Sequence, residues 1–463
     1  MTLDLARLMS SDGPDKYDLH NRYLNSQMVK VLRTIGFDRN YVRGQGQYLY
    51  DQDGHEYLDL LSGFGTFAIG RNHANVIAAL QEVLGGGLPN LVQLDVSVLA
   101  GVLAERLLDY MPGLDKMFFC NSGAEAVEAA IKFARFATGR PRILFCDHAF
   151  HGLTNGALSL NGEKTYRAGF EPLLPGCTPI PFNGLERLEE ELARGEVAAF
   201  IVEPIQGKGV TMPVGDYLRE AAALCRKYGA LFVADEIQTG VGRTGRFLAI
   251  EHWGVDADMV LLAKALSGGF IPVGAVAAKK WVYDKVFDRM DRAVVHGSTF
   301  AKNDMAMAAG LATLEVIETE NLIRHAEEIG NGIMADLGSM VGRHEFVKEV
   351  RGKGLMIGIE FDKPRSLGLK AAWALLEQAR KGLFSQMIII PLMQDHRILS
   401  QVAGDNMNVI KPLPPLTIND TDRAWIREGF EAAIVDAHRV PGALWDLGRS
   451  LAGGGMKARV GAA

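Results

Sequence analysis

Short apolar runs recur along the middle of the chain, and helix-length segments separate them between about residues 75 and 330. Each run is continuous rather than alternating and is bounded by polar or glycine residues, as in strands that are buried on both faces of a sheet. Helical stretches at 125–137 and 217–229 lie between them. The pattern predicts an α/β fold with a mostly parallel, doubly wound sheet. The five predicted strands are residues 116–120, 142–146, 198–202, 230–234 and 259–263.

The two ends of the chain follow a different pattern. Residues 44–69 alternate apolar and polar positions around an Asp53-Gly54 turn, which predicts a hairpin. The quartet at 51–54 lacks the full ligand pattern of a calcium loop, so we expect a plain turn and no metal site. Beyond residue 330 the pattern is of the α+β kind. It predicts strands within 350–361 and 408–418 and helices within 371–382 and 422–440.

These patterns divide the chain into parts. We predict a large domain at 75–330 and a small α+β domain at 331–440, to which the N-terminal segment 1–74 also belongs. The composition of 441–463 predicts a flexible tail. A length of 463 residues agrees with two domains rather than with one small core.

Composition and charge narrow the possible functions. Apolar residues make up 48% and charged residues 22% of the chain, as in ordinary globular proteins. The net charge of −6 gives no indication of nucleic acid or an anionic membrane as a partner. The four cysteines show no metal-ligand spacing, which favours reduced thiols in the cytoplasm. The N-terminus lacks the apolar core of a signal peptide, and the apolar run at 387–393 is too short to span a membrane.

Polar or glycine residues follow each of the five apolar runs directly. In open α/β sheets, ligands bind outside the carboxyl ends of the strands. If the runs pair in one sheet, their polar ends converge on a single crevice, where we expect the functional site. These ends are residues 121–124, 147–152, 203–207, 235–240 and Lys264.

The residue types at these ends indicate a specific chemistry. Ser122 lies just before a helix, where free N–H groups and the helix dipole favour an anion, although an ordinary N-cap serine would look the same. Phe150 offers a flat face for a ring. Asp235 leaves an apolar strand and needs a cationic partner, and Lys264 is an amine able to form a Schiff base. A snorkelling lysine is the plain alternative for Lys264, but the set together matches pyridoxal phosphate.

The motifs around these residues resemble a known family. The segments NSGAEAVEAAIKFAR, FHG, IVEPIQG, VADEIQTGVGRTG, LLAKALSGGFIPVGA and HGSTF occur in this order. They are similar to those of the class III (ornithine/ω-amino acid) aminotransferases, which are pyridoxal-phosphate enzymes of fold type I. The resemblance runs from about residue 25 to 435. It implies a ping-pong aminotransferase and a homodimer with shared active sites.

The resemblance implies a role for each residue around the cofactor ring. Lys264 would carry the cofactor as a Schiff base and then move the proton between substrate and cofactor. Asp235 would hold the proton of the pyridine nitrogen, and Gln238 would donate a hydrogen bond to the ring oxygen. Phe150 would stack on the ring, with His151 beside it.

The resemblance also implies where the cofactor phosphate binds. Ser122, Gly123 and Ala124 would form the phosphate cradle. Thr299 in HGSTF would reach the phosphate held by the neighbouring subunit, so each site of the homodimer would use residues from both chains.

Two positions depart from the pattern of many family members. Leu153 stands where an arginine often follows the aromatic-His-Gly triplet, and Lys411 stands where an arginine often binds a substrate carboxylate and pairs with the glutamate matched by Glu203. Lysine offers a point charge in place of the arginine fork. We therefore expect an amino-acid donor held through Lys411 and an acceptor aldehyde or ketone with an apolar or uncharged body. Glu203 and Lys411 would form either a switch that opens for the donor or a static ion pair.

Several alternatives remain open. The chain is also similar to class III aminotransferases of bacterial hopanoid side-chain synthesis, which would aminate a lipid-borne aldehyde. An ornithine, acetylornithine or ω-amino acid aminotransferase is the alternative within the family. The GxGxxG sequence at 240–245 would favour an NAD-dependent oxidoreductase, but it neither follows a strand directly nor opens a clear helix. A non-catalytic binding module is a further alternative, against which Lys264 and Asp235 argue.

Overall fold

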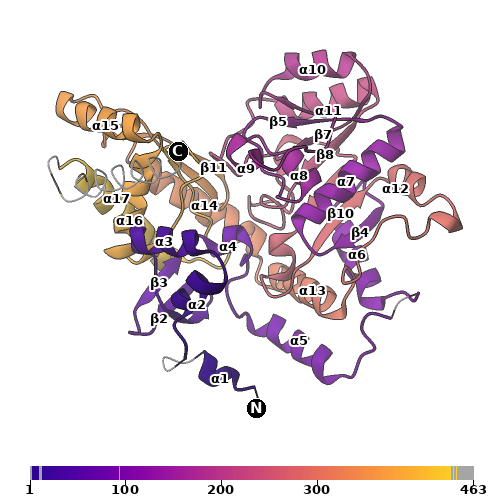
Figure 1. Cartoon of the computed structure of the whole chain (residues 1–463), viewed down its shortest axis with the longest axis horizontal. Helices are drawn as coiled ribbons and strands as arrows, with labels where there is room; N and C mark the ends of the chain where they lie inside the picture. The colour runs from indigo at the N-terminus through magenta and orange to yellow at the C-terminus, as the bar shows by residue number, and fades with distance from the viewer. Residues whose placement is uncertain (1–2, 10–12, 93, 440–441, 443–444, 446–463) are drawn as a thin grey trace.

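The computed structural model describes residues 3–9, 13–92, 94–439, 442 and 445. Figure 1 shows the central part of the chain on one side and elements from both chain ends together on the other. The mixed α/β architecture predicted from the sequence is confirmed. The exact boundaries assigned to the domains remain predictions.

A seven-stranded sheet forms the centre of the larger part (Figure 1). All five predicted strands belong to it, and the strand order is β4-β10-β9-β8-β7-β5-β6. The five neighbours from β9 to β6 are parallel, whereas β10 runs antiparallel to both β9 and β4. The strands are β4 (Lys116–Cys120), β5 (Arg142–Cys146), β6 (Cys177–Ile180), β7 (Val197–Val202), β8 (Leu231–Asp235), β9 (Met259–Leu262) and β10 (Gly274–Ala278).

The strands β6 and β10 were not predicted from the sequence. Both are short, and β10 consists of glycine, alanine and a single valine, so it lacks the bulky apolar run that marks its neighbours. The small residues have a packing reason, because a Cβ at Gly274 would lie 2.4 Å from the carbonyl oxygen of Ser122. The strand therefore passes directly against the turn that follows β4.

Helices pack against this sheet and carry most of the remaining central segment. Helix α7 (Gly123–Thr138) contacts β4 and the strands from β7 to β10, and α11 (Tyr217–Tyr228) contacts β8. The predicted helices at 125–137 and 217–229 are therefore present. The others in this part are α5 (Ala74–Gly85), α6 (Val98–Asp109), α8 (Asn155–Ser159), α9 (Lys164–Arg167), α10 (Leu185–Ala193), η1 (Ala249–Trp253), η2 (Lys264–Ser267), α12 (Lys280–Val286), η3 (Met290–Arg292) and α13 (Asp304–Thr319).

Two smaller sheets contain the chain ends. In the first, β13 from the C-terminal part pairs in parallel with β3 from the N-terminal part. The predicted strand within 350–361 is in fact part of a hairpin, because Gly354 turns the chain between β11 and β12. The strand expected within 408–418 shrinks to two residues, since the prolines that follow lack the N–H group for pairing. The strands are β1 (Tyr41–Gln45), β2 (Tyr48–Asp51), β3 (Glu56–Asp59), β11 (Val347–Lys353), β12 (Met356–Phe361), β13 (Ile398–Leu399) and β14 (Val409–Ile410).

The helices of the chain ends complete this part. The apolar run at 387–393 lies within α16, whose apolar side chains are buried, and α16 packs against α17. Within the described residues, no helix combines the length and apolarity needed to cross a bilayer. The helices are α1 (Leu5–Leu8), α2 (Lys16–Tyr23), α3 (Ser26–Ile35), α4 (Ser62–Gly65), α14 (Leu322–Gly338), α15 (Leu367–Ala379), α16 (Leu383–Gln394) and α17 (Asp420–Ala437).

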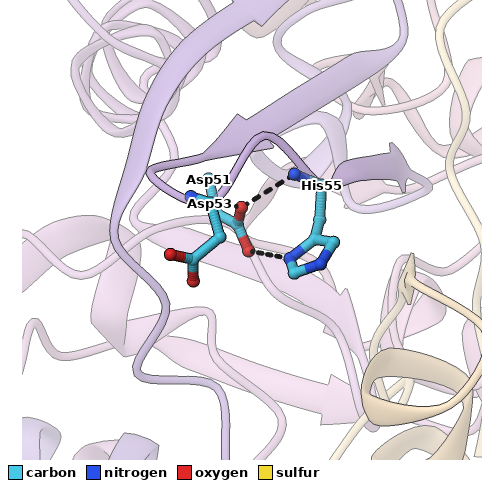
Figure 2. A group of neighbouring side chains, drawn as sticks. All are labelled: Asp51, Asp53 and His55. Carbon is cyan, nitrogen blue, oxygen red and sulfur yellow. Dashed lines mark hydrogen bonds and ion pairs between the residues drawn. The ribbon is translucent and has the colours of Figure 1, made fainter.

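The acidic quartet at 51–54 forms the turn between β2 and β3. Figure 2 shows Asp51, Asp53 and His55 close together. Their possible ligand atoms lie within 4.8 Å of one another. The Asp51 carboxylate accepts hydrogen bonds from the backbone N–H groups of Asp53 and His55 and from the Tyr57 hydroxyl, and it contacts His55 Nδ1 at 3.1 Å. The carboxylate thus holds the turn, and the hairpin that the alternating pattern predicted is present.

A buried carboxylate ties the two chain ends together. Asp422, in the first turn of α17, accepts hydrogen bonds from Gln47 Nε2 at 2.6 Å and from the Tyr48 hydroxyl at 2.7 Å. It also accepts one from the backbone N–H of Asn419. Each of its partners would lose a buried acceptor if the carboxylate were removed.

Trp445 lies in the segment predicted as a flexible tail, yet it is buried. Its Nε1 donates a hydrogen bond to the carbonyl of Ala437, and its ring lies near those of Phe346 and Phe384. The rest of that predicted tail, apart from Gly442, lies outside the described residues.

The Asp422 network predicts a stability effect. Replacing Asp422 with alanine leaves three donors without their acceptor, one of them on the buried Gln47, and should lower the free energy of unfolding by about 2–4 kcal/mol. Thermal denaturation followed by circular dichroism measures this loss. Asp420→Ala, at an exposed carboxylate in the same turn, is the matched control and should shift the melting temperature far less. Equal shifts for the two variants would contradict this role of Asp422.

Candidate active site

Lys264 stands at the carboxyl end of β9 in a strained backbone conformation. Its φ of +45° lies in the left-handed region, which costs free energy for a residue with a Cβ atom. Burial lowers the pKa of the Lys264 amine, while the charges of Asp235 and Glu203 oppose that shift. No acceptor in the described part of the chain takes a hydrogen bond from its Nζ. The strand end therefore presents a partly buried amine whose hydrogen-bonding capacity is unused.

Asp235 and His151 form a buried pair beside this amine. Asp235 Oδ2 lies 2.6 Å from His151 Nδ1, and both side chains are at most 3% exposed. Asp235 Oδ1 accepts a hydrogen bond from the backbone N–H of Ile237. Burial alone would lower the pKa of His151, but the hydrogen bond and charge of Asp235, helped by Glu203, outweigh it and raise that pKa. The raised pKa favours the charged form of His151, which is the cationic partner that Asp235 needs.

The turn before α7 is held tightly on both sides. Ser122 Oγ accepts a hydrogen bond from the Glu125 N–H, so the serine is an N-cap. A Cβ at Gly123 would lie 2.9 Å from the Ile237 side chain, and one at Gly152, whose φ is +125°, would lie 2.8 Å from the Ala124 Cβ. The N–H groups of Gly123 and Ala124 lie in the first turn, where a helix offers them no partner. The turn is therefore a rigid donor cradle.

The Gly207 peptide links Glu203 to Lys411. Its N–H donates to Glu203 Oε2 at 2.6 Å, and its carbonyl accepts a hydrogen bond from Lys411 Nζ. Lys411 Nζ also donates to Gln238 Oε1 at 2.9 Å. A Cβ at Gly207 would lie 2.9 Å from both the Glu203 and the Gln238 oxygens, so only glycine fits. The direct Glu203–Lys411 ion pair that we expected is wrong for the described chain, because the backbone of Gly207 lies between the two side chains.

Burial and the neighbouring charges shift the pKa values of Lys411 and Glu203. Burial and then the neighbouring Lys264 lower the pKa of Lys411 to about 7, although Glu203 opposes the shift. Burial raises the pKa of Glu203, which His151 partly offsets. Gln238, expected to reach the cofactor, donates through Nε2 to the Phe64 carbonyl. Its amide is therefore engaged on both sides.

The remaining predicted residues are more open. Phe150 is partly buried, and its ring meets that of Tyr166 edge to face at 5.7 Å. Its backbone N–H donates to Glu203 Oε1, which fixes the ring beside the cluster. Leu153 is 55% exposed. Thr299 is also exposed and has no side-chain partner in the described chain, while the neighbouring Ser298 accepts a hydrogen bond from Asn121 Nδ2.

One buried lysine in this region was missed. Lys208 follows Gly207, is 6% exposed, and its Nζ has no hydrogen-bond acceptor in the described residues. The sequence signal was its place between two glycines directly after the polar end of β7.

The GxGxxG segment at 240–245 forms consecutive turns rather than the start of a helix. Arg243 within it is buried and donates to the carbonyls of Leu355 and Pro414. The segment therefore joins the large sheet to the C-terminal part and has none of the geometry of a dinucleotide site.

Comparison with known proteins decides the family. Residues 33–434 match the model of the family Aminotransferase class-III. The chain belongs to the class-III aminotransferases. It is 34% identical over 441 residues to Aminotransferase PigE of a Serratia species, with 88% of this chain and 52% of PigE aligned. It therefore spans about half the length of PigE. It is 38% identical over 395 residues to an acetylornithine aminotransferase of Bacillus cereus, with 84% and 92% aligned.

Solved structures of similar sequence share the fold of this class-III aminotransferase. The ornithine aminotransferase of Toxoplasma gondii has a TM-score of 0.77 and 31% identity, covering 86% of this chain and 90% of its own. An amine transaminase from an uncultivated Pseudomonas species, in a form with bound pyridoxal phosphate, has a TM-score of 0.75 and 30% identity, covering 86% and 94%. The predicted fold type, enzyme class and cofactor are thereby confirmed.

The residues present fit pyridoxal phosphate. The free amine of Lys264, the buried carboxylate of Asp235 and the donor cradle before α7 match its carbonyl, ring nitrogen and phosphate. His151 Nε2 is buried without a hydrogen-bond partner in the described chain, so the site still has a donor to offer.

The pKa of Lys411 predicts a pH dependence of anion binding. Below a pH of about 7 the Lys411 ammonium is charged, and above it the amine is neutral in the empty site. Affinity of the enzyme freed of its cofactor for an unreactive carboxylate such as butyrate should therefore fall as pH rises through 7. Calorimetric titrations on both sides of that pH measure the effect.

Lys411→Arg is the matched control for this titration. Arginine remains charged throughout, so the variant should bind butyrate with little pH dependence. A wild-type affinity that does not change across this range, or a variant with the same slope as wild type, would contradict binding by Lys411.

Proposed function

We propose that this class-III aminotransferase moves an amino group from an amino-acid donor to an aldehyde or ketone with an apolar body, by a ping-pong mechanism. The observation that carries the proposal is the pair of substitutions at the substrate end. Leu153 places an exposed apolar side chain where many relatives carry an arginine, and Lys411 offers one buried cation for a single carboxylate. A lipid-borne aldehyde of the hopanoid type belongs to this acceptor class.

Each residue of the site would have a distinct role in the reaction. Bound pyridoxal phosphate supplies the electron sink of the reaction. Lys264, with its lowered pKa, would bind the cofactor carbonyl and then carry a proton at Nζ. Asp235, held by His151 Nδ1, would keep the ring nitrogen protonated. Phe150 would pack on the ring and so exclude water from it.

The polar groups around the ring would hold the cofactor and the donor. The first-turn N–H groups of Gly123 and Ala124, with Ser122 before them, would bind the phosphate. Gln238 would turn its amide toward the ring oxygen when Lys411 leaves it for a donor carboxylate. Glu203 supports this arrangement through the backbone of Gly207, because its carboxylate accepts from the Gly207 N–H while the Gly207 carbonyl anchors Lys411.

A second candidate lies within the same family. The similarity to an acetylornithine aminotransferase, at 38% identity and 92% coverage of that protein, favours an acceptor that carries a carboxylate. The two candidates differ in the acceptor. An enzyme regenerated by long-chain aldehydes but not by N-acetylglutamate semialdehyde supports the proposed function, and the reverse supports the second candidate.

We also propose a homodimer whose subunits share each site. Apolar side chains are exposed on two segments that approach one another, as the hydrogen bond from the Asp304 N–H to Asn90 Oδ1 shows. A second copy of the chain is the partner of matching chemistry, since it would cover these side chains and bring Thr299 to the other phosphate. The exposed apolar residues are Leu88, Val92, Leu94, Val96, Val98, Met290, Val294, Val295 and Phe300.

The central role of Lys264 has a direct test. Borohydride treatment of the enzyme with its cofactor should bleach the visible absorbance band and add the mass of the reduced cofactor to the peptide that contains Lys264. Lys264→Ala should show neither the band nor the mass. Lys285→Ala, an exposed lysine on α12, is the control and should behave like wild type. Attachment at any other lysine would overturn the assignment.

Shared sites predict a complementation experiment. Thr299→Ala alone should bind pyridoxal phosphate more weakly by about tenfold, because one charge-assisted hydrogen bond to the phosphate is lost. In mixed dimers of Thr299→Ala with Lys264→Ala subunits, half of the sites regain both residues. Spectral titration of the cofactor should then show that fraction with wild-type affinity. Weak binding at every site of the mixed dimer would contradict sharing.

A further inference from the structure

Helices α2 and α3 pack against each other as a helical hairpin whose open end is attached to the rest of the molecule. At the start of α2, Lys16 Nζ donates to the Arg39 carbonyl at 2.6 Å. At the end of α3, the Ile35 carbonyl accepts a hydrogen bond from Gln394 Nε2. Every residue from 18 to 28 is exposed. The closed end of the helical hairpin therefore projects into solvent.

The closed end carries large apolar side chains. Tyr23 ends α2, Leu24 follows it, and Met28 lies in the first turn of α3, so the chain itself keeps these three close together. They are 64%, 70% and 54% exposed. Leu19 and Val31, one turn further along each helix, are exposed as well. Exposed apolar side chains that gather in one place mark an interaction surface. We call Tyr23, Leu24 and Met28 the hairpin tip.

Positive charge dominates the same helical hairpin. Over residues 16–37 the chain has four cations and one acid, whereas the net charge of the whole chain is −6. The acid, Asp18, lies 3.6 Å from Arg33, and this ion pair is weak because both side chains are exposed. The whole-chain charge, which gave no indication of an anionic membrane, conceals this local excess. The cations are Lys16, Arg22, Lys30 and Arg33.

A polar pocket of about 330 Å³ lies between the two helices, next to the hairpin tip. Lys30 and Arg33 bring two of the cations to it, and Ser26 adds a hydroxyl group. Charged N–H donors beside a hydroxyl suit the phosphate oxygens of a lipid headgroup. The lining residues are Asn21, Ser26, Val29, Lys30, Arg33 and Thr34.

We propose that this helical hairpin docks on a bilayer that contains anionic phospholipids. The hairpin tip would enter the boundary of the acyl chains, while Lys30 and Arg33 would bind headgroup phosphates at the pocket. Helices that combine exposed apolar side chains with neighbouring cations bind such membrane surfaces. Tyr23 suits this boundary, because its ring is apolar and its hydroxyl can stay in the headgroup layer.

A second copy of the chain fits this surface less well. It would bring the same cations, so like charges would meet if two hairpin tips packed together. The apolar side chains that we assign to the homodimer lie on other segments, within 88–98 and 290–300. A lipid surface of negative charge complements both the apolar tip and the cations around it.

The inference goes beyond the proposed function, because the bilayer would be bound whatever acceptor the enzyme uses. It agrees with that function, since an acceptor with a large apolar body partitions from water into a bilayer. Docking would bring the enzyme to the surface where such an acceptor is concentrated. Vesicle binding needs no substrate, so failure of docking and failure of the proposed acceptor class are measured separately.

Vesicle sedimentation of the enzyme with its cofactor tests the docking. Wild type should bind vesicles of phosphatidylcholine and phosphatidylglycerol in equal amounts, and it should bind phosphatidylcholine alone more weakly. Salt should weaken binding to the mixed vesicles, because it screens the charges. Lys30→Gln combined with Arg33→Gln should weaken that binding by about 25-fold, since each cation near such a surface contributes about fivefold. Wild type that stays in solution with both kinds of vesicle would overturn the proposal.

Variants of the hairpin tip test the apolar contribution. Leu24→Ser combined with Met28→Ser should weaken binding to both kinds of vesicle by at least about tenfold, because less apolar surface leaves water on docking. Each variant should keep the visible band of the cofactor, which reports an intact fold. Leu24→Ser alone takes the place of the double variant should that variant lose the band.

Matched controls make the same chemical changes elsewhere. Leu367→Ser combined with Leu375→Ser removes two exposed leucines of α15. Lys280→Gln combined with Lys285→Gln removes two exposed cations of α12. Both should bind vesicles as wild type does, and controls weakened as much as the hairpin variants would contradict a specific surface.

The oligomeric state separates a lipid surface from a subunit contact. Analytical ultracentrifugation without lipid should give the same assembly for wild type and for the hairpin variants. Variants that dissociate into monomers there would assign the hairpin tip to the partner subunit and overturn docking on a bilayer.

Discussion

Charge held away from water at the carboxyl edge of the large sheet constrains the site around it. An isolated buried ion costs several kcal/mol. The free energy of unfolding of a whole domain is only about 5–15 kcal/mol, so one or two such ions would unfold it. Two sets of contacts offset part of this cost. His151 contacts Asp235, and the backbone of Gly207 bonds to both Glu203 and Lys411. What remains uncompensated is mostly positive. The site is therefore built to be completed by anions, which the cofactor phosphate and substrate carboxylates are. The buried charged side chains at this edge are Lys208, Glu203, Asp235 and Lys411, and Lys264 is partly buried.

Backbone groups, rather than side chains, do much of the positioning. The backbone of Gly207 links Glu203 to Lys411 through its N–H and its carbonyl, and no larger residue fits there. Gly274 lets β10 pass within reach of the Ser122 carbonyl, and Gly152 approaches Ala124 with a backbone angle that only glycine adopts without strain. Three close approaches of backbone thus hold the cradle, the ring pocket and the substrate end in register.

Much of this could be predicted from the sequence because strands buried on both faces leave an unbroken apolar signal. The five central strands and the polar ends that follow them are of this kind. The β10 strand was not predicted, because close packing there allows only glycine and other small residues in place of bulky apolar ones. The direct Glu203–Lys411 pair failed for a related reason, since a peptide group inserted between two side chains leaves no mark in their residue types. Lys208 escaped because only burial, which a sequence does not display, distinguishes it from a surface lysine.

The parallel pairing of β3 with β13 has a consequence for synthesis on the ribosome. Strands β1 to β3 emerge before the large sheet, but the strand that completes their sheet and the Asp422 carboxylate that ties them down are made only after it. At cellular elongation rates the gap is on the order of tens of seconds, far longer than a hairpin takes to form. During that time β3 presents an unpaired edge next to another nascent chain on the same messenger. Protection of that edge, by chaperones or by the already folded large sheet, is therefore a condition for making this enzyme in quantity.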